Sequence, residues 1–288
     1  MPIRYPQVLA LRDEERRFSW TPWDTMLYAL AVGAGSDPAR EGELGFVLED
    51  RLRALPTLAT VVAWGAGVSP AQLGIDRRRT LHGAEHILLH RLMPAAGEVI
   101  ARSRVAAVYD KGDKGAIIER ETVLEDVGSG DPLVTLRRTA FARADGGFGG
   151  PSDSPPAPES PDREPDRVLR FATRPDQALL YRLCGDRNPL HSDPEAARQA
   201  GFAQPILHGL CTFGICCRGV LEAYCGFDPS RLAEFSARFS APVVPGDDLE
   251  VRLWRDGGEV AFDARVPARD AFVIKGGRAL LRPGSVSA

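Results

Sequence analysis

The spacing of apolar positions changes from helical to alternating twice along the chain. In the first half, residues 22–31 place apolar side chains about 3.6 residues apart, after Thr21 and a proline that favour a helix start. Residues 44–47 predict a short extended segment, and the apolar run 55–64 is interrupted by glycine and proline, so any helix there is short. From Glu85 onward, alternating runs separated by turn residues predict long antiparallel strands.

The second half repeats this order. Helical spacing predicts short helices over 175–183 and 194–199 and a long apolar helix over 207–224. Alternating runs then predict four strands, at 234–240, 248–256, 259–266 and 271–281. Between the halves, residues 147–166 are rich in Pro, Gly, Ser and Asp and almost free of apolar side chains, which is typical of a linker.

The two halves also share landmarks in the same order, such as Tyr28-x-Leu in the first half and Tyr181-x-Leu in the second. A repeat of this length indicates two copies of one structural unit. We therefore predict an α+β protein with repeats at 1–146 and 167–288, each an antiparallel sheet wrapped around a helix, and packed sheet to sheet as a pseudo-dimer.

Candidate chemistry is concentrated in the second half. Asp186, Asn188 and His191 lie within six residues, beside a proline that restricts the backbone, and His208-Gly209 begins the long apolar helix. The first N–H groups of a helix have no intrahelical partner and can bind a ligand oxygen. Taken alone, Asp-x-Asn-Pro is typical of turns. Together with the helix start, it predicts an acid/base pair facing an oxyanion site.

The first half has the same predicted order of helices and strands but lacks these acid, amide and imidazole side chains. When the halves are aligned, residues 32–35 stand opposite 185–188, and residues 58–60 stand opposite 207–209, with no acid or imidazole in either first-half segment. This arrangement of helices and strands therefore does not need the polar residues in order to fold. Chemistry explains their presence better than folding does.

Residues 181–197 (YRLCGDRNPLHSDPEAA) and 204–214 (QPILHGLCTFG) resemble the signature of the MaoC-like, (R)-specific enoyl-CoA hydratases of the hydratase 2 group, whose fold is the hotdog. First-half segments such as YALAVGAG resemble the amino-terminal half of the two-hotdog hydratases. The resemblance implies a double hotdog, in which a non-catalytic first repeat with a shortened helix contributes the acyl or CoA pocket. The second repeat is then the catalytic one.

The resemblance also implies roles for individual residues. In this family the Asp and His activate a water, the Asn positions groups, and the Gly gives its N–H to the thioester oxygen; these are Asp186, His191, Asn188 and Gly209 here. The implied reaction is the reversible hydration of a trans-2-enoyl-CoA to the (3R)-hydroxyacyl-CoA, with no metal and no cofactor beyond the CoA of the substrate. Three alternatives stay open: a hydratase for branched, dicarboxylic or steroid side-chain CoA esters, a catalytically silent acyl-CoA-binding subunit, and a hotdog thioesterase.

Further residues are candidates for substrate binding. Lys111 and Lys114 lie in one predicted turn, where they either contact the CoA phosphates or are simply solvated. Arg187 stands where relatives often have an aromatic residue, and His208 either faces the ligand or, as we favour, orders the loop. The short first-half helix predicts a deep tunnel for long or bulky acyl groups.

Composition narrows the class of protein. The net charge of −3 gives no basic excess for nucleic acid, and no apolar run approaches the ~18 residues of a membrane helix. The five cysteines show no metal-ligand spacing and are interpreted as reduced, buried filler. The start does not resemble a signal peptide, and the ending, 285–288, is not of peroxisomal type. We therefore expect a cytoplasmic protein, with a homodimer left open.

Overall fold

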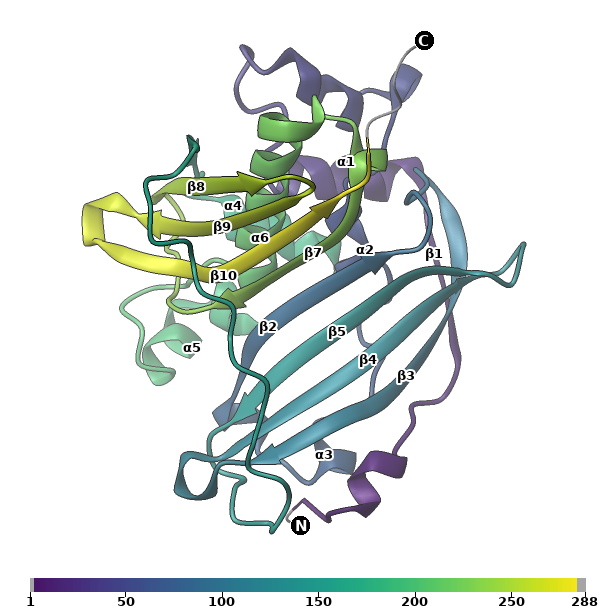
Figure 1. Cartoon of the computed structure of the whole chain (residues 1–288), viewed down its shortest axis with the longest axis vertical. Helices are drawn as coiled ribbons and strands as arrows, with labels where there is room; N and C mark the ends of the chain where they lie inside the picture. Colours follow the sequence, from purple (N-terminus) through teal and green to yellow (C-terminus); the bar gives the residue numbers. More distant parts are fainter. Residues whose placement is uncertain (1–2, 284–288) are drawn as a thin grey trace.

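The structure, a computed structural model, describes residues 3–283, whose strands form one curved antiparallel sheet with the larger helices on its inner side (Figure 1). The first half contributes β1 (Arg16–Trp20), β2 (Thr80–Leu89), β3 (Gly97–Asp110), β4 (Ala116–Asp126) and β5 (Pro132–Ala142). The second half contributes β6 (Arg167–Ala172), β7 (Leu232–Phe239), β8 (Asp248–Asp256), β9 (Glu259–Val266) and β10 (Ala271–Leu281). The predicted strands of both halves are confirmed.

The two halves join edge to edge through β2 and β7, with His86 opposite Ser236. The strand order β1-β3-β4-β5-β2-β7-β10-β9-β8-β6 is therefore symmetric about this pair. Our expectation that the halves pack sheet to sheet is wrong. Each half would otherwise leave a strand edge with unpaired N–H and C=O groups, and pairing the two edges satisfies both.

The helices are α1 (Pro22–Ala31), α2 (Ala59–Val62), α3 (Pro70–Leu73), α4 (Gln177–Tyr181), α5 (Pro194–Gln199) and α6 (Gly209–Val220), the last continuing as a π-helical turn over Leu221–Cys225. Helix α1 begins as predicted, because the Thr21 hydroxyl accepts the Asp24 N–H and the Asp24 carboxylate accepts the Thr21 N–H. None of the described helices is long and apolar enough to cross a membrane.

Residues 44–47 are not extended as predicted, because residues Glu41–Phe46 form a 3₁₀ turn. Four residues are too few for the apolar pattern to distinguish a strand from a turn. Glu43 and Phe46 are both fully buried, and a spacing of three residues on one side is what a 3₁₀ turn provides. The first-half helix, by contrast, is short as predicted, since α2 ends before Gly65.

Helix α6 is the centre of the core. A Cβ at Gly214 would come within 2.6 Å of Val32 and 2.9 Å of the Tyr28 hydroxyl, so α6 packs against the first half with no room for a side chain there. Cys216 and Cys217 are fully buried and free, as predicted, and burial raises the pKa of both thiols. They act as small apolar filler around the helix.

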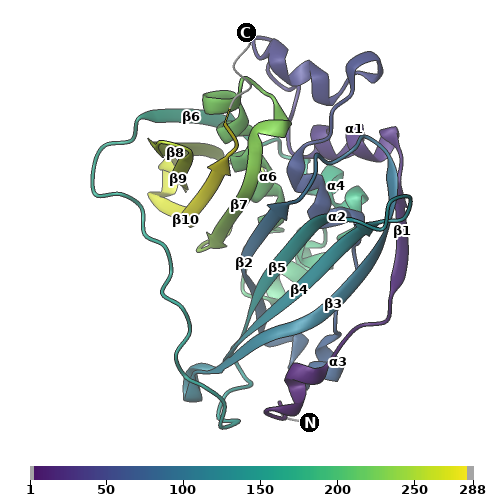
Figure 2. The same cartoon turned by 45° about the vertical axis from the view of Figure 1, so that its right-hand side comes forward.

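The linker, residues 147–166, has no helix or strand and runs over the outer side of the second-half sheet (Figure 2). Polar contacts hold it there: Ser160 Oγ donates to Asp263 at 3.0 Å, and Trp254 Nε1 donates to the Arg163 carbonyl at 2.8 Å. Gly276 has a φ of +60°, and a Cβ at this position would collide with the linker backbone. The domain boundary at this linker stays a prediction.

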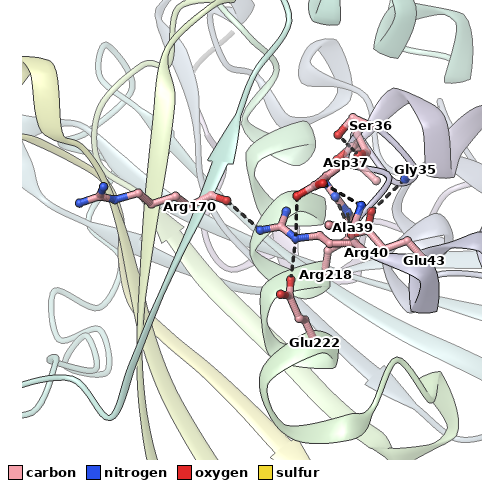
Figure 3. A network of polar contacts seen from close by, with 11 residues as sticks. Gly35, Ser36, Asp37, Ala39, Arg40, Glu43, Arg170, Arg218 and Glu222 are labelled. Carbon is pink, nitrogen blue, oxygen red and sulfur yellow. Dashed lines mark hydrogen bonds and ion pairs between the residues drawn. The ribbon is translucent and has the colours of Figure 1, made fainter.

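One buried ion pair connects α6 to the first half (Figure 3). Arg218 donates to Glu43 Oε1 from Nε at 2.9 Å and from Nη2 at 2.6 Å, and its Nη1 donates to the Val32 carbonyl at 2.6 Å. The second Glu43 oxygen accepts the Gly35 N–H at 2.9 Å. Only 3% of the Arg218 side chain and 0% of the Glu43 side chain are exposed, so neither charge is solvated by bulk water.

We predict that Arg218→Met lowers the free energy of unfolding by about 3–5 kcal/mol, because the substitution leaves the buried Glu43 carboxylate uncompensated. Urea denaturation of the full chain measures this change. The control, Arg174→Met, removes an exposed pair with Asp176 and should cost about 0–1 kcal/mol. An equal loss of unfolding free energy in the two variants would show that the buried pair contributes no more than an exposed one.

Candidate active site

The loop between α4 and α5 places Asp186 beside the start of α6. Gly185 has a φ of +135°, and a Cβ there would lie 3.0 Å from Trp64 of the first half. Both the backbone conformation and the close packing therefore favour glycine at this position. Asp186 Oδ1 accepts the Asn188 N–H at 3.1 Å, and Asn188 Oδ1 accepts the Leu190 N–H at 3.2 Å. Asn188 itself is exposed, and its amide shapes the turn that carries the neighbouring candidates.

His191 is oriented as a proton acceptor. Its Nδ1 lies 2.8 Å from the Ile206 carbonyl oxygen, and this contact is a hydrogen bond only if Nδ1 carries the proton. Nε2 is then left with a free lone pair. Burial lowers the pKa of His191 below its usual value of 6.5, against the opposing effects of the Ile206 hydrogen bond and the Asp186 charge. The ring is therefore neutral near pH 7.

His208 stacks on His191, with the ring centroids 3.7 Å apart. Its Nε2 donates to the backbone carbonyl of Asp186 at 3.1 Å, which ties the loop to the start of α6. Burial, together with the neighbouring His191, lowers the pKa of His208 to about 3, so this ring is also neutral. The geometry fits the loop-ordering role that we favoured for His208.

Gly209 is the first residue of α6, and its N-cap residue, His208, makes no side-chain capping bond. The first N–H groups of the helix therefore stay available to a ligand oxygen. A Cβ at Gly209 would lie 3.1 Å from the Phe239 ring. The absence of a side chain thus avoids a tight contact with Phe239 and also favours the close approach of a ligand.

The ligand atoms of Asp186, His191 and His208 all lie within 4.8 Å of one another. A carboxylate and a neutral imidazole at this separation can hold a water and accept its proton. The adjacent helix start can stabilise an oxygen on which negative charge develops. Asp186, His191 and Gly209, singled out in the sequence, are therefore brought together, and this arrangement suits proton transfer beside a polarised carbonyl.

Arg187 and the two lysines, the other predicted binding residues, are not among the side chains whose ligand atoms meet in this cluster. Arg187 is exposed on the loop. Lys111 and Lys114 lie in the turn between β3 and β4, where Lys111 Nζ donates to the Ser152 carbonyl of the linker. Among the described residues, no interaction connects this turn to Asp186. The contact of the two lysines with CoA phosphates stays a prediction.

A cavity lies below the shortened first-half helix, between α2 and the strands β2, β4 and β5, where the sequence predicted open space but not a charged lining. Its lining includes Trp64, Glu85, Arg120 and Arg138. Trp64 also packs against Gly185, so one side chain separates the cavity from the Asp186 loop. The room is small, about 30 Å³, and the deep tunnel expected for long acyl groups stays a prediction.

A signal for this cavity was present in the sequence. Ile118 and Leu124 of β4 are fully buried, and Arg120 falls on the same alternating face of the strand. An arginine on a strand face that also carries buried Ile118 and Leu124 is unusual, because a buried charge is costly unless it is paired. This departure from the strand pattern marks the cavity wall.

Two families match the chain: residues 156–272 match the MaoC like domain, and residues 18–144 match the MFE-2 hydratase 2 N-terminal domain. An enoyl-CoA hydratase of Mycobacterium tuberculosis is 40% identical over 96% of this chain and 98% of its own length. The peroxisomal enoyl-CoA hydratase 2 of Arabidopsis thaliana is 38% identical over 93% of both chains.

Solved structures agree with these matches. A MaoC-like dehydratase from Phytophthora capsici superposes with a TM-score of 0.88 at 31% identity, covering 98% of this chain and 100% of that chain. A protein of Mycobacterium tuberculosis described as a double hotdog superposes with a TM-score of 0.57 at 14% identity, covering 94% and 96% of the two chains. The predicted α+β double-hotdog fold is confirmed.

Three possible ligands within 4.8 Å also raise the question of a metal ion. We predict that the purified protein holds no stoichiometric zinc, because the lone pairs of an imidazole lie in its ring plane and the two stacked rings do not point at one common ion. Mass spectrometric metal analysis before and after dialysis against EDTA measures the content. One zinc per chain, lost together with thermal stability on dialysis, would contradict this prediction.

Proposed function

The chain belongs to the MaoC-like hydratase family of the hydratase 2 type, and we propose that it catalyses the reversible hydration of trans-2-enoyl-CoA to (3R)-hydroxyacyl-CoA. The observation that carries this proposal is the meeting of Asp186 and a neutral His191 at the uncapped start of α6. Relatives named enoyl-CoA hydratase 2 and 3-hydroxyacyl-thioester dehydratase support the two directions of the reaction.

In the proposed mechanism a water is held between the Asp186 carboxylate and Nε2 of His191. This pair takes a proton from the water while the water oxygen forms a bond to C3. The electrons of the C2–C3 double bond move toward the thioester oxygen, where the first N–H groups of α6, at Gly209, stabilise the developing charge. The abstracted proton is then delivered to C2, so the product differs from the substrate by one water.

The proposal needs no cofactor beyond the coenzyme A of the substrate. An acyl-CoA thioester is the expected ligand, and neither nucleic acid nor membrane is part of the proposal. A cytoplasmic location and a homodimer stay predictions, and some of the relatives are named as peroxisomal enzymes.

We predict that Asp186→Asn and His191→Gln each lower kcat by about 10²–10⁴-fold, because each removes a proton-transfer group. The rate is followed as loss of the enoyl thioester absorbance, with free thiol measured in parallel. Matched controls are Asp131→Asn and His90→Gln, which change exposed residues outside the site and should leave kcat within about twofold.

The same assay tests the reaction class. Loss of the double bond without thiol release is the hydratase result, and chiral analysis should find the (3R) product. Release of thiol at the rate of substrate loss would instead identify a thioesterase and overturn the proposal. Near-normal turnover by either Asp186→Asn or His191→Gln would overturn the mechanism.

The lowered pKa of His191 predicts the pH dependence of kcat/KM. The imidazole must be neutral to accept a proton, and a lowered pKa keeps it neutral at pH values where an ordinary histidine is already charged. We expect kcat/KM to stay level as the pH falls from about 8 through the usual histidine pKa of about 6.5, and to drop only below that value. A drop centred above pH 6.5 would contradict the assigned state of His191.

A further inference from the structure

Three ionisable side chains stand in one row across the inner side of the first-half sheet. Glu85 of β2 lies opposite Arg138 of β5, and Arg138 lies opposite Arg120 of β4. All three line the cavity below the shortened helix. Like charges directly opposite on neighbouring strands repel, so this arrangement requires a compensating anion.

Glu85 compensates only one of the two arginines. Its Oε2 accepts from Arg138 Nε at 2.9 Å and lies 2.8 Å from His82 Nε2. Burial lowers the pKa of His82 despite this partner, so His82 adds no charge near pH 7. Glu85 is 1% exposed, and its Oε1 has no hydrogen-bond partner in the described part of the chain. The cavity therefore contains unmet polar groups rather than a closed network.

Arg120 is the uncompensated group. Its Nη1 donates to the Val68 carbonyl at 3.2 Å, its buried Nε has no partner, and it forms no ion pair within residues 3–283. Burial and the nearby Arg138 lower the pKa of Arg120 to about 10, because the more distant Glu85 charge opposes them only in part, and Arg120 remains charged at neutral pH. Two guanidinium groups thus face a single carboxylate, and the cavity has an excess of one positive charge.

The cavity also adjoins the reaction centre. Trp64 packs on Gly185 on one side and lies under the Arg138 guanidinium, 5.7 Å from the ring centroid, on the other. Burial lowers the pKa of Arg138, but the opposing charges, mainly Glu85 with a smaller contribution from Asp186, outweigh it and raise that pKa. Arg138, which lines the cavity, is therefore close enough to interact with the Asp186 charge, and Trp64 lies between the cavity and the Asp186 loop.

We propose that this cavity binds a carboxylate at the far end of a short acyl chain, so that the preferred substrates are 2-enoyl-CoA esters of dicarboxylic acids. The inference rests on the proposed function. A carboxylate matches the planar N–H donors of a guanidinium and supplies the charge that Arg120 lacks. A methyl end in the same place would leave that charge buried and unpaired. The volume of about 30 Å³ also suits a small polar group better than a long alkyl chain.

The test compares 2-hexenedioyl-CoA with 2-hexenoyl-CoA, two esters of equal length that differ in the terminal carboxylate. For the full chain we expect kcat/KM to be about tenfold or more higher for the dicarboxylic ester. Arg120→Met should remove this preference by lowering kcat/KM for the dicarboxylic ester about tenfold or more, while kcat/KM for 2-hexenoyl-CoA does not fall, because its methyl end no longer meets a buried charge. Arg120→Lys should keep part of the preference.

Arg137→Met is the matched control. Arg137 is the neighbour of Arg138 on β5, its side chain is 59% exposed, and it pairs with Glu121 outside the cavity, so the preference should be unchanged. Hydration of 2-hexenoyl-CoA without a preference for the dicarboxylic ester in the unmodified chain would overturn the inference and leave the proposed function standing. An equal loss for both esters in Arg120→Met would overturn it as well. Hydration of neither ester would overturn both proposals.

Discussion

The position of α6 against the first half is the constraint on which the site depends, and the Arg218–Glu43 pair fixes it. A buried ion pair adds little net stability, because removing two charges from water costs about as much as their attraction returns. It does penalise any other placement of α6, since a shift would leave both charges buried and unpaired. Because α6 carries Gly209 at its start, this pair deep in the core also determines where the first N–H groups of the helix lie.

Strand prediction succeeded where one side of a strand is buried and the turn is marked. β8, β9 and β10 have the predicted bounds; β8 and β9 alternate in sequence, and Gly257-Gly258 marks the hairpin between them. The same pattern could not show how the halves join, since alternation tells which side of a strand is buried and not which edges pair. The turn Glu41–Phe46 was missed for a related reason: its conformation depends on Arg218, a partner far away in the sequence.

The candidate site likewise has a part that could be predicted from the sequence and a part that could not. Asp186, His191 and Gly209 could be named from local motifs, because the backbone that brings them together is itself local or begins a helix. The tautomer of His191 could not be predicted, since it depends on the Ile206 carbonyl. The charged cavity needed the cross-strand register of Glu85, Arg138 and Arg120, even though an arginine on an apolar strand face already indicated something unusual.

The internal symmetry explains why one chain builds one site. Tyr28 and Tyr181, equivalent in the two repeats, meet in the core with ring centroids 6.1 Å apart. The first-half residues opposite the Asp186 loop are 32–35, and there the Val32 carbonyl accepts from Arg218 while the Gly35 N–H binds Glu43. Two polar groups of that loop are therefore already engaged, one with α6 itself and one with the carboxylate that pairs with α6. The repeat that lacks the acid and the imidazole thus supplies the contact that positions α6 beside them in the other repeat.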